Sequence, residues 1–198
     1  LPMVKKWLGD LDKKDPDYEH HRLEGLWLVV AIRAAYPELA TEVLRSPSPQ
    51  ARAGAVRAVA NWSSKAGPIA KLRLLTQAVE DPHPRVRLEA VCALRDIGTL
   101  ESANLALRAM GQETDNNLAF ALELTVRHLR DKWLPAMQAG KSVFDGDPSR
   151  LAYALKEVGD PRAIAPLVEV IRKGGIAEAD LPQAVTTVSA LGQTVELD

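Results

Sequence analysis

The sequence predicts an all-α fold, a right-handed α-solenoid of about six helix pairs, from three observations. Alanine and leucine are abundant while aromatic residues make up only 5% of the chain, which favours helices over strands. Polar marks that suit a helix start, an Asp or Ser often followed by Pro, recur every 30 to 35 residues. Apolar residues follow each mark at helical spacing, and no long stretch alternates with a period of two. The marks are Asp15, Ser46, Asp81, Asp115, Asp145 and Asp180.

Each mark separates two helical runs, so the repeating unit is helix, turn, helix. The run GPIAKLRLLTQAV (67–79) precedes one mark, and QARAGAVRAVANW (50–62) follows another. One such pair cannot bury its apolar face alone, whereas a stack of pairs forms a continuous core. We therefore expect a single repeat domain over residues 1–198, taken from a longer protein. Its approximate units are 1–33, 34–64, 65–98, 99–132, 133–159 and 160–198.

The clearest copy of the unit is DPHPRVRLEAVCALRDIG, residues 81–98. Small residues at Ala90 and, one unit earlier, at Ala55 allow neighbouring helices to approach closely. We expect Asp81 to cap the helix that follows it. Arg87 is too far along that helix for an i,i+4 pair with Asp81, so its expected partner lies in a neighbouring repeat. The nearest equivalents are Asp115 and the turn near Ser46. The apolar stripe of this helix comprises Val86, Ala90, Val91, Leu94 and Ile97.

This unit resembles the HEAT repeat family, which has an Asp in the turn and then Val-Arg and a small residue in the second helix. Asp81, Val86, Arg87 and Ala90 match those positions, and Arg52 occupies the position of Arg87 one unit earlier. The resemblance implies that Asp and Arg side chains form a ladder between repeats and that the second helices line a concave face. Asp81, Arg87 and Arg52 are therefore the predicted structural ladder.

Two longer segments, HHRLEGLWL (20–28) and residues 131–163, resemble the HEAT segment of large exported bacterial proteins called PVC-type haem-binding proteins. Those proteins join a sugar-dehydrogenase-like β-propeller, a HEAT region and a c-type cytochrome domain carrying CxxCH. The resemblance implies an exported or periplasmic location and a spacer or docking role within a redox protein. This chain has one cysteine and no CxxCH, so we assign no residue to haem or dehydrogenase chemistry and expect no cofactor.

Residues that could carry out catalysis or bind a metal are scattered, and we predict neither a catalytic nor a metal site. His20 and His21 are adjacent, so on a helix they point about 100° apart. His83 is expected to be exposed just after a cap. Cys92 lies in the middle of an apolar helix, where a buried structural thiol is expected. The segment FDGDPS (144–149) lacks the ligand spacing of an EF-hand and is expected to be a turn with a helix cap.

The predicted function is a non-catalytic scaffold or protein-binding module. The formal net charge is -1, from 25 basic and 26 acidic residues, so nucleic acid is not an expected partner, and no apolar run is long enough to span a membrane. The expected partner is another protein or a neighbouring domain of the parent chain. Exposed Trp and Arg side chains contribute most of the binding energy at many interfaces. Candidates for partner binding are Arg22, Arg57, Arg85, Glu89, Trp62 and Trp133.

Two alternatives from other functional classes stay open. DNA-alkylation glycosylases are built on HEAT-like repeats and need clustered Lys and Arg residues to hold phosphates. A lyase-type HEAT protein that handles tetrapyrroles needs a pocket large enough for the chromophore.

Overall fold

The computed structural model describes residues 1–62, 67–159 and 164–174, together with 176, 178, 181–182, 184–186 and 188–189. These residues form helices, turns and loops and contain no strand, so the predicted all-α class is confirmed. The α-helices with described bounds are α1 Pro2–Gly9, α2 Tyr18–Ala31, α3 Pro37–Val43, α4 Pro49–Ala60, α5 Gly67–Ala78, α6 Pro84–Ile97, α7 Leu100–Ala106, α8 Asn116–His128, α9 Arg130–Gln138, α10 Pro148–Val158 and α11 Ile164–Arg172. Two short 3-10 helices are η2 Leu107–Gly111 and η3 Phe144–Gly146.

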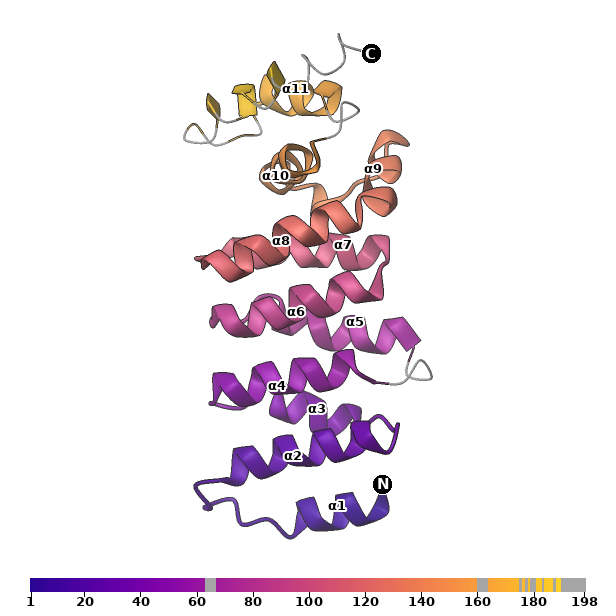
Figure 1. Cartoon of the computed structure of the whole chain (residues 1–198), viewed down its shortest axis with the longest axis vertical. Helices are drawn as coiled ribbons and strands as arrows, with labels where there is room; N and C mark the ends of the chain where they lie inside the picture. The colour runs from indigo at the N-terminus through magenta and orange to yellow at the C-terminus, as the bar shows by residue number, and fades with distance from the viewer. Residues whose placement is uncertain are drawn as a thin grey trace.

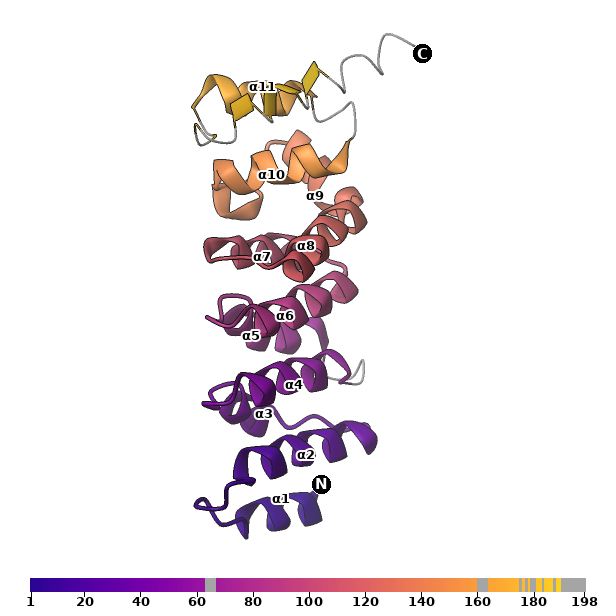
Figure 2. The same cartoon turned by 60° about the vertical axis from the view of Figure 1, so that its left-hand side comes forward.

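The helices stack as an α-solenoid of antiparallel pairs. Figure 1 shows α2, α4, α6 and α8 one above another along the long axis, with α3, α5 and α7 behind them. Figure 2 shows the same order from the N-terminal to the C-terminal end of the column. Each second helix packs on the second helix of the next unit, from α2 to α10. The expected approximate boundary between residues 132 and 133 falls inside α9.

Small residues bring the second helices close together. Ala55 on α4 and Ala90 on α6 are both fully buried, as the sequence predicts for positions of close approach. A Cβ atom added at Gly54 would lie 2.7 Å from Leu23 Cδ2, so a larger residue on α4 would force the Leu23 side chain on α2 to shift. Packing of this kind builds one continuous apolar core, which holds the second-helix layer in a fixed register.

α4 and α6 each begin after two polar residues that act in turn. The first is the mark in the sequence, and the second, two residues later, is the N-cap. Ser46 accepts a hydrogen bond from the N–H of Ser48 at 3.1 Å, and Ser48 is the N-cap of α4. In the same way Asp81 accepts from the N–H of His83 at 2.9 Å, and the His83 side chain caps α6. The expectation that Asp81 is the cap is therefore wrong, and His83, which was expected to be exposed, is half-buried. Asp115 does cap α8 directly, and the mark at 180 lies outside the described residues.

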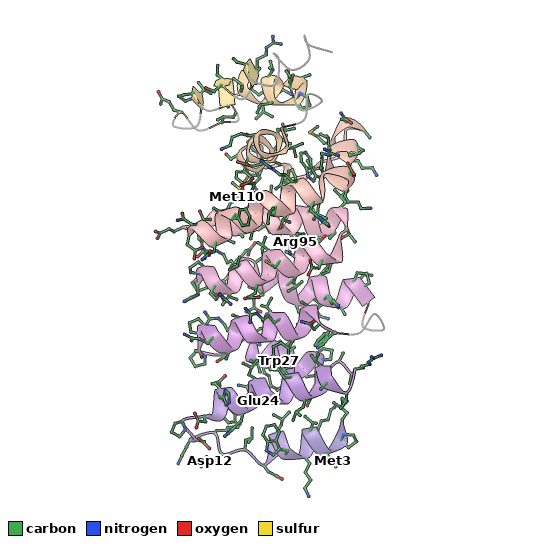
Figure 3. All side chains as sticks on the ribbon, viewed as in Figure 1. Met3, Asp12, Glu24, Trp27, Arg95 and Met110 are labelled. Carbon is green, nitrogen blue, oxygen red and sulfur yellow. The ribbon has the colours of Figure 1, made fainter. Side chains whose placement is uncertain are left out.

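The N-terminal end of the column differs from its middle. α1 has no buried residue, and Met3, labelled at the N-terminal end in Figure 3, is exposed.

The fifth pair consists of α9 and α10, and α9 contains Pro135. The segment FDGDPS supplies the turn η3 and the cap of α10, because Asp147 accepts the N–H groups of Ser149 and Arg150.

Candidate interaction surface and arginine rungs

Arg52 joins the second unit to the third through a bidentate ion pair. Its Nε lies 2.7 Å from Asp81 Oδ2, and its Nη2 lies 2.9 Å from Asp81 Oδ1. Its Nη1 also donates to the carbonyl of Ser46 at 2.8 Å, within its own unit. The hydrogen bonds to Asp81 raise the pKa of Arg52, so the guanidinium stays charged. We call this contact between neighbouring repeats the closed rung.

Arg87 occupies the equivalent position one unit later, but it meets only neutral oxygens. Its Nη1 donates to the carbonyls of Asp81 at 2.7 Å and Pro82 at 3.1 Å, and to Gln112 Oε1 at 3.2 Å. Its Nη2 donates to the carbonyl of Glu113 in the next unit, and its Nε has no partner. The side chain is only 1% exposed. We call this contact the open rung.

The predicted partners of Arg87 are therefore wrong in detail. Asp115 instead uses its carboxylate to accept the N–H of Leu118 at 2.8 Å. The turn near Ser46 contacts Arg52, not Arg87. The spacing in the sequence correctly predicts that Arg87 contacts the next repeat. The acceptor atom in that repeat depends on the backbone conformation of the connection before α8.

Three of the predicted partner-binding residues form one ion-pair cluster. Arg57 on α4 reaches Glu89 on α6, with Nε 2.8 Å from Oε2 and Nη2 2.6 Å from Oε1. Arg85 also contacts Glu89, with Nε 3.0 Å from Oε1. The hydrogen bond with Glu89 raises the pKa of Arg57. Both arginines are exposed while Glu89 is half-buried, so the cluster lies at the surface across two units.

Arg22 is separate from that cluster. It pairs with Glu19 at 3.1 Å on its own helix and with Glu42 at 2.9 Å on α3. Its side chain also lies over the ring of Tyr18, 5.2 Å from the centroid. These contacts join α2 to α3 near the N-terminal end and leave Arg22 outside the Arg57–Glu89 surface.

A tryptophan in such a helix pattern is more often core than a binding residue, and Trp62 and Trp133 were candidate anchors only if partly exposed, a condition that neither meets. Both are buried, at 3% and 0% exposure. Trp133 donates its indole N–H to the carbonyl of Val126 at 3.0 Å and packs against Phe144, with ring centroids 5.2 Å apart. The helix-end position of each tryptophan suggested exposure, but both rings belong to the apolar core.

Sequence reasoning missed an exposed apolar pair on α8. Phe120 is 60% exposed and Leu124, one helical turn later, is 37% exposed. The N-caps of α4, α6 and α8 are Ser48, His83 and Asp115, and these parallel helices pack side by side. Arg57, Cys92 and Leu124 each stand nine residues after their own cap, so they occupy one row across three units. The only signal in the sequence was an i,i+4 apolar pair, which resembles core.

We define the second-helix face by this row and its neighbours. It comprises Arg57, Arg85, Glu89, Cys92, Phe120 and Leu124.

Cys92 is half-buried rather than buried, which corrects the sequence-based expectation. Burial raises the pKa of its thiol, which lowers the thiolate fraction near neutral pH. Among the described residues, no group of three or more His, Cys, Asp and Glu side chains is placed to hold a metal ion.

A groove of about 760 Å³ lies between the end of α9, the start of α10 and α11. Its size suits a small-molecule ligand. Its apolar lining includes Met137 and Leu151, and its charged residues are Glu169 and Lys173. These two lie 3.1 Å apart as an exposed ion pair. Among the described lining residues Lys173 has no second cation beside it for the paired carboxylates of a tetrapyrrole.

Comparison with known families agrees with the stacked helix pairs. Residues 37–126 match the family described as HEAT repeats, and residues 149–173 match the PBS lyase HEAT-like repeat. No curated protein matches the chain. None of the described helices combines the length and the apolar character that crossing a bilayer requires. Residues 37–126 therefore carry HEAT repeats, within an α-solenoid of stacked helix pairs.

Proposed function

We propose that this chain is a non-catalytic HEAT-repeat scaffold that binds a protein partner through the second-helix face. The observation that carries this proposal is the pair Phe120 and Leu124, exposed one turn apart beside a cluster of paired charges. HEAT repeats are modules of protein interaction and scaffolding, and the HEAT-repeat match includes both residues.

The apolar pair is the centre of the proposed interface. Large aromatic side chains contribute most when a partner buries them and excludes water around them. Most of the Phe120 side chain is exposed and can be buried by a partner, and Leu124 extends the apolar patch along the helix. A partner that covers both removes apolar surface from water, which supplies the driving force for association.

The charged part of the face indicates the chemistry of the partner. Glu89 pairs with both Arg57 and Arg85, so its carboxylate offsets one of the two positive charges and already contacts both arginines. A nucleic-acid phosphate would have to compete with that carboxylate for both arginines. A protein surface with an apolar side chain at its centre and polar groups of both signs around it fits better. These contacts favour a protein over DNA.

A finer role follows from the resemblance to PVC-type haem-binding proteins. We propose that the module acts as a spacer or docking domain beside dehydrogenase and cytochrome c domains of a larger exported protein. The support is the similarity of residues 20–28 and 131–163 to that HEAT segment. Reading the complete gene tests this point, because a CxxCH motif downstream is expected and its absence would contradict the finer role.

The coarser proposal is tested with two matched variants of the chain as affinity baits. Phe120→Ser removes the apolar centre of the second-helix face. Ile69→Ser makes the same kind of change on α5, where Ile69 is 81% exposed in the first-helix layer. We expect a partner captured by the wild type and by Ile69→Ser to be reduced at least about tenfold with Phe120→Ser, the loss expected for an aromatic hot spot.

Thermal unfolding controls for stability, because exposed substitutions change the free energy of unfolding by about 0.5 kcal/mol or less. Partner capture that survives Phe120→Ser and is lost with Ile69→Ser would assign binding to the opposite layer. A shifted mobility of DNA at low salt, abolished by Arg57→Ala and Arg85→Ala, would favour the nucleic-acid alternative instead.

A further inference from the structure

Arg87 is a buried cation without a carboxylate partner among the described residues. Its four hydrogen bonds end on three backbone carbonyls and one side-chain amide oxygen. Burying a charge without an opposite charge is unfavourable, even where neutral acceptors surround it. The Nε–H group also has no acceptor, although it is shielded from solvent. The open rung is therefore incomplete in both charge and hydrogen bonding.

The closed rung shows what completes such a site. At Arg52, the edge formed by Nε and Nη2 holds both oxygens of the Asp81 carboxylate. The matching edge of Arg87 holds one carbonyl, that of Glu113, at Nη2 and nothing at Nε. A guanidinium presents this edge as two parallel donors that fit a carboxylate. The vacant donor therefore has the geometry of a carboxylate site.

Arg87 also lines a pocket. It has a volume of about 400 Å³ and is lined by Arg87, by Pro82 and Pro84 at the start of α6, and by Thr114 and Asp115 at the start of α8. Two helix N-termini thus meet at the pocket, and both favour negative charge. The carboxylate of Asp115 also lines it, but its Oδ1 accepts the N–H of Leu118. The carboxylate of Glu113 is on an exposed residue.

We propose that this pocket binds a carboxylate, the side chain of an Asp or Glu on a protein partner. Because the Nε–H is shielded from solvent, binding requires the connection before α8 to move so that the Glu113 carbonyl leaves Nη2. One carboxylate oxygen then accepts the Nε–H of Arg87, and the other takes the place of the Glu113 carbonyl at Nη2. The bound group repeats, between the third and fourth units, the contact that Asp81 makes with Arg52. The pocket lies in the turns and not on the second-helix face, and its chemistry can be tested on the isolated chain. Failure of either proposal therefore leaves the other open to test.

The test follows the Nε–Hε signals of individual arginines by nuclear magnetic resonance in the wild-type chain, so no destabilised variant is needed. The probe is the capped peptide acetyl-Gly-Glu-Gly-amide, and the matched control is acetyl-Gly-Gln-Gly-amide. We expect the Glu peptide to shift the Arg87 signal saturably, with a Kd on the order of 10 mM for one charge-assisted contact. Arg52 serves as the control within the molecule, because Asp81 already occupies its Nε, and its signal should not move.

Three results would overturn the proposal. The first is an Arg87 signal that neither peptide moves, or that the Gln peptide moves equally. The second is a shift with acetate but none with the Glu peptide, which would assign the pocket to small free carboxylates. The third is faster exchange of the Arg87 Hε proton in Glu113→Gln, which would show that the chain's own carboxylate closes the rung.

Discussion

Two arginines at the same position in consecutive repeats make different contacts. Arg52 closes its rung with the Asp81 carboxylate, whereas Arg87 ends on the backbone carbonyl of Glu113. The difference is not in the type of residue available, because Asp81 and Glu113 each stand two residues before the N-cap of a second helix. An acidic residue is therefore present at both rungs, and only one of them uses its carboxylate.

The connection before each second helix explains the difference. Asp81 lies in the turn after α5, where its side chain also accepts the N–H of His83 and is thereby directed into the turn. Before α8, the chain leaves the 3-10 helix η2 through Gln112 in an extended conformation, with φ -140° and ψ 169°. That backbone brings the carbonyl of Glu113, not its side chain, to Arg87. Backbone geometry in the turn thus decides which acceptor completes a rung.

The largest effect is expected from Arg87→Ala. This change leaves the carbonyls of Asp81, Pro82 and Glu113 without their donor and opens a cavity between two repeats. We expect a loss of about 3 kcal/mol in the free energy of unfolding, seen as a fall in Tm on the order of 10 °C by circular dichroism.

Arg87→Met sharpens this prediction because it keeps most of the volume without the buried charge. It should cost less than Arg87→Ala, since removing an unpaired buried cation offsets part of the lost hydrogen bonding. An unchanged Tm for Arg87→Ala, combined with lost partner binding, would show that Arg87 serves recognition and not stability.

A smaller effect is expected at Cys92, which lies on α6 between the two rungs. Burial raises the pKa of this thiol, so fewer molecules carry the reactive thiolate at pH 8 than for a free cysteine. Alkylation of the native protein should be slow, should continue to rise with pH beyond the ordinary cysteine range, and should be fast in denaturant. Equal rates in the native and denatured protein would contradict the half-buried position.

Local signals in the sequence were enough to predict the helical repeat. The Asp and Ser marks, the Pro residues after them and the apolar stripes depend on only a few neighbouring residues, and the helices appear where they indicate. The spacing from Ser46 to Arg52 and from Asp81 to Arg87 likewise placed both arginines in the first half of a second helix, within reach of the turn before it. Each of these signals lies within one repeat, and successive repeats have similar surroundings. A reading of single repeats is therefore enough to predict the helices.

The features that depend on packing between units could not be predicted in this way. Trp62 and Trp133 stand near helix ends, but both are buried in the apolar core. Phe120 and Leu124 have the spacing of core residues, yet α8 turns them to the surface. The acceptor of Arg87 depends on the conformation of Gln112, which no residue pattern specifies.

The comparison of the two rungs is tested most directly by one pair of double-mutant cycles, measured as free energies of unfolding. The first cycle combines Arg52→Ala with Asp81→Ala, and the second combines Arg87→Ala with Glu113→Ala. We predict a coupling energy of about 1–3 kcal/mol for the closed rung and one below about 0.5 kcal/mol for the open rung, because Glu113→Ala leaves the bonded carbonyl in place. Equal coupling energies in the two cycles would contradict the distinction between a closed and an open rung.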